Sequence, residues 1–146
     1  MEKSVYSAVL TPFKKDLTID TKLFISHCEF LLKNNISLAP LGTTGEANSV
    51  SISEKVDLIK TIANSDLPKE KIIIGTGNTS FVDAALLTKT AVENKIYSVL
   101  LLPPFYYKNV SDEGVYQYYK EIIKTVNLTN LRVFLYKFNF IKLTFL

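Results

Sequence analysis

The stretch "ISLAPLGTTGEANSVSISEK", residues 36–55, decides how this sequence folds. It opens with an apolar run typical of a buried strand, continues through a loop with two glycines and two threonines, and ends in a pattern that begins a helix. The glycines predict either a turn through positive φ or a close approach to the backbone, and the threonines supply hydroxyl groups. Such a loop holds a small anion or only makes a capped turn, and these residues alone leave both interpretations open.

The same strand–loop–helix order repeats along most of the chain. We predict strands at 5–10, 36–41, 71–75, 97–102 and 131–136, where short runs are apolar and β-branched. Helices are predicted between them, beginning after Asp20, after Ser51 with Glu54, after Ser80 with Asp83, and after Ser111 with Glu113, the last running through Val126. Strand ends that recur at this spacing indicate a βα repeat with a parallel sheet.

Polar loops follow each predicted strand, which favours a barrel in which chemistry lies at the C-terminal ends of the strands. A dinucleotide-binding fold is disfavoured, because "GTGNTS" (75–80) has only the first two glycines of that fingerprint and follows the third strand. A complete barrel takes about 250 residues, whereas this chain stops after its fifth predicted strand. The predicted fold class is therefore α/β, of the (β/α)8 TIM-barrel type, with only about the first five strands present.

Composition excludes several other classes of protein. The 146 residues carry a net charge of +3, with 47% apolar and 21% charged residues, which is typical of a soluble globular domain. The sixteen lysines and the single arginine, Arg132, are scattered, so we expect no nucleic-acid partner. The lone Cys28 excludes an internal disulfide, and the lone His27 is expected to pack on a helix face. We expect no metal, no cofactor, no membrane partner and a cytoplasmic location.

Five ordered motifs carry a family resemblance: "TPF" (11–13), "LGTTGEANSVS" (41–51), "IIGTGNTS" (73–80), "LLLPPFYYKNVSDEG" (100–114) and "FLY" (134–136). Together they resemble the dihydrodipicolinate synthase and N-acetylneuraminate lyase family over about residues 5–136. The resemblance implies class I aldolase chemistry on pyruvate or a similar 2-oxo acid, through a Schiff base on a lysine amine. It also implies a homo-oligomer, a dimer or a tetramer, for the full-length family.

Residue roles follow from the resemblance. Thr43 would relay a proton to Tyr136, and Thr44 with Gly45 would bind the substrate carboxylate. Tyr107 would complete the relay across a subunit interface, although the adjacent Tyr106 is an alternative and an aromatic interface cluster without catalysis is another. Glu46, at the entrance to a helix, is expected to satisfy loop amides rather than to act as a base.

The resemblance implies a Schiff-base lysine some two dozen residues or more beyond Tyr136. After Tyr136 the sequence holds only Lys137 and Lys142, which come too early for that position. We therefore divide the chain into residues 1–136, the N-terminal part of an aldolase-type barrel, and an atypical tail, 137–146, that suggests a frameshift or a truncated gene. Whether the chain is itself an enzyme stays open. The alternative is a catalytically inactive fragment that associates with itself or with a full-length homologue through "PPFYY" (103–107).

Overall fold

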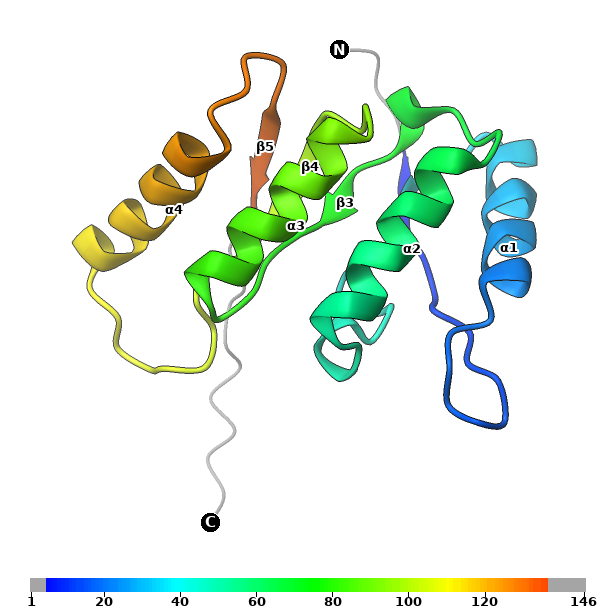
Figure 1. Cartoon of the computed structure of the whole chain (residues 1–146), viewed down its shortest axis with the longest axis horizontal. Helices are drawn as coiled ribbons and strands as arrows, with labels where there is room; N and C mark the ends of the chain where they lie inside the picture. The colour runs from blue at the N-terminus through cyan, green and yellow to red at the C-terminus, as the bar shows by residue number, and fades with distance from the viewer. Residues whose placement is uncertain (1–4, 137–146) are drawn as a thin grey trace.

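The computed structural model describes residues 5–136, in which strands and helices alternate as predicted (Figure 1). In chain order they are β1 Tyr6–Ala8, α1 Thr21–Lys33, β2 Ser37–Ala39, α2 Ile52–Asn64, β3 Ile74–Gly75, α3 Phe81–Glu93, β4 Ser98–Leu101, α4 Asp112–Val126 and β5 Arg132–Leu135. Two short 3-10 turns, η1 Ala47–Ser49 and η2 Lys69–Lys71, precede α2 and β3. Every predicted strand is present but shorter than predicted. The predicted tail, 137–146, lies outside the described residues.

The strands form one parallel series in chain order. β1 pairs with β2, and β3, β4 and β5 pair in sequence. A parallel bridge between Leu38 and Ile72 joins the two groups, and the Ile73 and Gly75 amides donate to Leu38 O and Pro40 O, both at 2.9 Å. All strands therefore run in one direction, and the loops that follow them gather at one end of the molecule (Figure 1).

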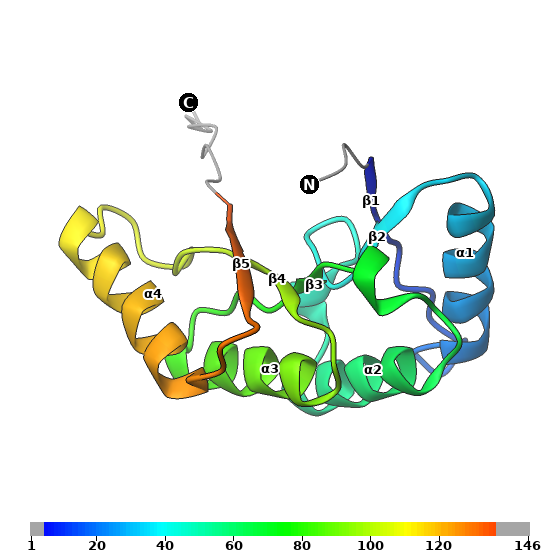
Figure 2. The same ribbon diagram turned by 90° about the horizontal axis from the view of Figure 1, so that it is seen from above.

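The helices cover one face of the strands in a curved layer. Figure 2 shows α1, α2, α3 and α4 as an arc along one side. Strand side chains that pack in the core with these helices are almost completely buried, as for Leu38, Ile74 and Val99. Their neighbours Leu100 and Phe134, paired across β4 and β5, stay only half-buried. This curvature, with helices outside and half-open side chains inside, is that of a barrel wall.

Side-chain caps fix where the helices begin. Ser51 and Glu54 form the predicted capping box, in which the Ser51 amide donates to the Glu54 carboxylate at 3.0 Å. Asp20 and Ser80 cap α1 and α3 through the Leu23 and Asp83 amides, at 2.9 Å and 3.3 Å. Ser111 caps α4 by accepting a hydrogen bond from the Gly114 amide, so α4 begins after Ser111, as predicted.

His27, near the centre of α1, lies half-buried, which agrees with the helix-face packing predicted for it. Cys28 is buried with Phe24. Burial raises the pKa of the Cys28 thiol to about 12.

Among residues 5–136, no helix is both long and apolar enough to cross a membrane.

The close contact between Gly75, at the end of β3, and Leu41 can be tested by substitution. A Cβ at Gly75 would lie 2.1 Å from Leu41 O and 2.6 Å from Leu41 C, whereas at Gly42 the nearest atom is 4.0 Å away. We expect Gly75→Ala to lower the free energy of unfolding by about 1–3 kcal/mol or more, since two backbones must separate. Gly42→Ala, the matched control, should change it by less than about 1 kcal/mol. Equal denaturant midpoints for the two variants would contradict this packing.

Candidate functional site

A small cavity lies where the loops after β2, β3 and β4 meet. Its volume is about 160 Å³, and it is lined by Leu41, Gly42, Thr43, Ala47, Asn48, Gly77, Leu102 and Phe105. The carboxyl ends of parallel strands are the usual place for chemistry in this kind of fold. The cavity therefore lies at the end of the molecule where the sequence predicted the site.

The glycines of the 42–46 loop do not make its turn. None of the described glycines has a positive φ; the left-handed residues here are Leu41, with φ 58°, and Glu46, with φ 52°. A Cβ at Gly45 would lie 2.7 Å from Val9 O and 3.2 Å from Thr11 Oγ1. Of the two roles predicted for the loop glycines, close approach is therefore the one that Gly45 fills, because its backbone packs on the end of β1.

The loop leaves several hydrogen-bonding groups available. Its internal bonds run from the Glu46 amide to Thr43 O at 3.0 Å and from the Ala47 amide to Gly42 O at 3.3 Å. Within residues 5–136, the amides of Thr43, Thr44 and Gly45 donate to no acceptor, and both threonine side chains are exposed. Two hydroxyls and three N–H groups on consecutive residues make a set of donors suited to a carboxylate.

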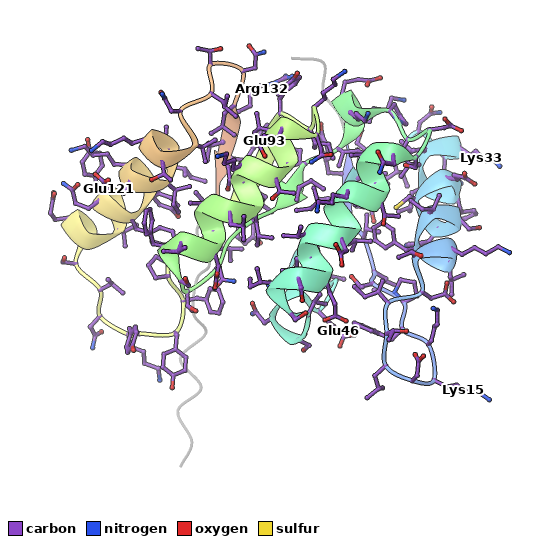
Figure 3. The ribbon with its side chains drawn as sticks, in the orientation of Figure 1. Lys15, Lys33, Glu46, Glu93, Glu121 and Arg132 are labelled. Carbon is purple, nitrogen blue, oxygen red and sulfur yellow. The ribbon has the colours of Figure 1, made fainter. Side chains whose placement is uncertain are left out.

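Glu46 does not play its expected role. It precedes η1 and makes no side-chain cap hydrogen bond there. Its side chain is exposed at the loop end of the molecule, opposite the end that holds Arg132 and Glu93 (Figure 3). The expectation that Glu46 satisfies the loop amides is wrong, because the residue takes a left-handed conformation as the last residue of the turn.

Thr11 is a polar residue to which the sequence assigned no role. It is 6% exposed, and its Oγ1 has no hydrogen-bond partner among the described residues. The hydroxyl lies beside Gly45, under the loop that carries Thr43 and Thr44. A buried hydroxyl without a partner calls for a structural or functional explanation. The "TPF" motif marked this position, but only the structure shows the unpartnered hydroxyl.

The predicted tyrosines occupy the same end of the molecule. Tyr136 directly follows β5, and its amide donates to Leu101 O at 3.2 Å. Tyr106 and Tyr107 are both 73% exposed on the loop after β4, and their rings meet edge to face with centroids 5.2 Å apart. Phe105, just before them, lines the cavity. Because Tyr106 and Tyr107 are equally exposed, the structure does not choose between them as the predicted interface residue.

Burial shifts the pKa values of two other titratable groups, Lys55 and Tyr118. Lys55 is 4% exposed; burial lowers the pKa of its amine, and the nearby Asp83 carboxylate opposes that shift. Tyr118 donates to Asn78 O in the loop after β3, and burial raises the pKa of its phenol to about 12. Residues 5–136 contain no group of three or more His, Cys, Asp or Glu side chains placed to hold a metal ion.

A family model described as the dihydrodipicolinate synthetase family matches residues 1–144. The chain belongs to this family. It is 36% identical over 134 residues to a 4-hydroxy-tetrahydrodipicolinate synthase from Bacillus subtilis, covering 91% of this chain and 45% of that protein. Family membership confirms the resemblance carried by the five motifs.

Solved structures agree on the fold. The crystal structure of dihydrodipicolinate synthase from Agrobacterium tumefaciens superposes with a TM-score of 0.86 at 30% identity, covering 92% of this chain and 47% of that one. A variant of the Sulfolobus solfataricus 2-keto-3-deoxygluconate aldolase, solved as a pyruvate complex, gives a TM-score of 0.80 at 28% identity, covering 93% and 45%. The chain thus spans about half the length of its dihydrodipicolinate synthetase relatives, and its strands match the first half of a TIM barrel.

Gly45 offers a test of how the site is built. We expect Gly45→Ala to displace the loop from the end of β1, because the added Cβ would lie 2.7 Å from Val9 O. Overpacking of this kind costs about 1–3 kcal/mol, and it should also move the backbone amide NMR signals of Val9 and Thr11. Gly42→Ala, in the same loop but with free space around it, is the control. Unchanged stability and unchanged signals for Gly45→Ala would show that the loop does not rest on β1.

Proposed function

We propose that this chain carries the substrate-carboxylate part of a Schiff-base aldolase or lyase site that acts on pyruvate or a related 2-oxo acid. The observation that carries the proposal is the donor set of the 42–46 loop, two exposed hydroxyls and three amides without acceptors among the described residues. Membership of the dihydrodipicolinate synthetase family and the pyruvate complex of the aldolase relative support the same substrate class.

Thr44 and Gly45 are the proposed carboxylate-binding residues. A carboxylate has two oxygens that accept several hydrogen bonds, and amides together with a hydroxyl satisfy them without a counter-charge. Gly45 also lets the loop sit close to β1, which fixes the amides in one place. Hydrogen bonds to a charged group are worth about twice those between neutral groups, so few are needed.

Thr43 and Tyr136 are the proposed proton relay. A phenol with an ordinary pKa of about 10 is a poor proton shuttle alone, so an adjacent hydroxyl that hands the proton on is a sensible arrangement. Thr43 lines the cavity, and Tyr136 follows the fifth strand at the same end of the sheet. Tyr107, exposed on the loop after β4, would reach the relay of a second subunit.

The covalent step needs an amine. In this chemistry a lysine amine adds to the keto carbon and water leaves, and the resulting imine accepts the electrons of the carbon–carbon bond that breaks. We assign this chain to the binding and relay parts of the site. Lys137 and Lys142 follow Tyr136 too closely for the nucleophile expected from the resemblance, and both lie outside the described residues.

A second candidate function is self-association. The exposed Tyr106 and Tyr107 side by side favour it, because tyrosine is enriched at protein interfaces and two adjacent rings offer a large apolar surface. In this alternative the chain binds another copy or a full-length homologue through residues 103–107 and performs no chemistry of its own.

Pyruvate affinity tests the carboxylate assignment. We expect Thr44→Val to weaken pyruvate binding at least about tenfold, because a hydrogen bond to a charged group contributes about 1.5–3 kcal/mol. Thr125→Val, the same change on the exposed last turn of α4, should bind as the unmodified chain does. Isothermal titration calorimetry measures both. Equal affinities for the two variants would remove Thr44 from the site.

Borohydride trapping tests the covalent assignment. Chain incubated with pyruvate and sodium borohydride should show no stable mass increase on any lysine, since we place the imine-forming amine elsewhere than on Lys137 or Lys142. Intact-protein mass spectrometry followed by peptide mapping gives the answer. A stoichiometric adduct on either lysine would overturn this division of roles.

A further inference from the structure

We propose that Tyr118 is a positioning residue for the cavity at the strand ends. Its hydroxyl donates a hydrogen bond to the loop after β3, and Gly77 of that loop lines the same cavity as Thr43. This inference rests on the proposed function for its ligand. It adds a residue from α4, a helix that lines no part of the cavity, to the machinery of the site. No motif in the sequence pointed to Tyr118.

Packing against neighbouring side chains holds the ring of Tyr118 in place. The ring is half-buried, packs against the cluster of Ala84, Leu101 and Ile122, and meets the Tyr119 ring edge to face with centroids 5.7 Å apart. Burial raises the pKa of its phenol to about 12, so the hydroxyl stays protonated, and a donor, at neutral pH. This hydroxyl donates to the carbonyl oxygen of Asn78, forty residues earlier in the chain.

The loop after β3 is held firmly at its two ends. At the first end, the Thr76 amide donates to Leu100 O at 3.0 Å, and the Thr88 hydroxyl donates to Thr76 Oγ1 at 2.9 Å. At the second end, the Ser80 amide donates to Asn78 Oδ1 at 3.0 Å before Ser80 caps α3. Among the described residues, Tyr118 supplies the only hydrogen bond that reaches residues 77–79 from outside the loop and α3.

The cavity depends on where this loop lies. A Cβ at Gly77 would be 2.7 Å from the Leu102 amide nitrogen and 2.8 Å from Leu102 Cβ, so the two backbones are in close contact. Gly77 and Leu102 both line the cavity. Because there is no slack between them, a small displacement of Asn78 changes the shape of the wall shared with Thr43. The Tyr118 hydrogen bond is thus coupled to the cavity through two residues.

Tyr118→Phe is the variant that tests this, because it keeps the packed ring and removes only the hydroxyl. Tyr116→Phe is the matched control: Tyr116 is exposed on the same helix, and its ring contact is with Lys120. We expect Tyr118→Phe to lower the ¹⁵N order parameters of residues 77–79 from a rigid value of about 0.85 to below about 0.6. We expect its pyruvate affinity to fall about three- to tenfold, the loss of one net hydrogen bond. The control should change neither.

The two measurements separate the possible failures. If the order parameters of Tyr118→Phe match those of the unmodified chain, the positioning role is overturned. If the loop loosens while pyruvate affinity, measured well below the melting temperature, stays the same, then Tyr118 is merely structural and the proposal is again overturned. If the unmodified chain binds no pyruvate, the proposed function fails, and the order parameters still decide whether Tyr118 positions the loop.

Discussion

Backbone-to-backbone contact between neighbouring strand ends is the constraint on which this structure depends. Three glycines mark it: Gly45 against Val9, Gly75 against Leu41, and Gly77 against Leu102. At each position a Cβ would come within 2.7 Å or less of a backbone atom of the neighbouring segment. None of the three needs a positive φ, so glycine serves for space alone. These contacts seat the loops after β2 and β3 against their neighbours and so define the cavity.

The order of elements could be predicted from the sequence because it depends on local signals. Apolar runs mark the strands, and Ser51 with Glu54 marks the start of α2 by a bond within one turn of helix. Strand lengths were overestimated, since pairing extends over only two to four residues per strand and an apolar run does not show where pairing stops. The family assignment succeeded because five motifs occur in order, and the match over residues 1–144 confirms it.

Features that depend on contacts between distant residues could not be predicted. The sequence leaves open whether the loop glycines make the turn or allow a close approach. In the structure Leu41 and Glu46 adopt the left-handed conformation, and Gly45 makes the close approach to β1. Two further features depend on contacts between separate elements, and no spacing rule reveals them. The Thr11 hydroxyl lies beside Gly45 with no hydrogen-bond partner among the described residues, and the Tyr118 hydroxyl donates to Asn78 O. The roles of Thr43, Thr44, Gly45, Tyr107 and Tyr136 remain proposals.

The curved layer is open along its two outer strands, β1 and β5. Within residues 5–136, β1 and β5 each pair with a single strand. Leu135 is 62% exposed and, with Val133, lines a hollow between β5 and α4. Sheet edges and exposed apolar side chains of this kind are sites at which further chain pairs. The matched region covers 45% of the Bacillus subtilis relative and 47% of the Agrobacterium tumefaciens structure, so both are about twice as long as this chain. The 42–46 loop, by contrast, is built entirely from described residues.

The most direct test of the account is an NMR titration of the 146-residue chain with pyruvate, followed through backbone amide signals. The central claim concerns the three consecutive amides of Thr43, Thr44 and Gly45, which donate to no acceptor within residues 5–136, because an anion that binds there must take hydrogen bonds from them. We expect saturable shifts that are largest at Thr43, Thr44 and Gly45, with smaller shifts at Gly77 and Leu102. Saturable shifts centred on any other part of the chain, or no shifts at millimolar pyruvate, would contradict this claim.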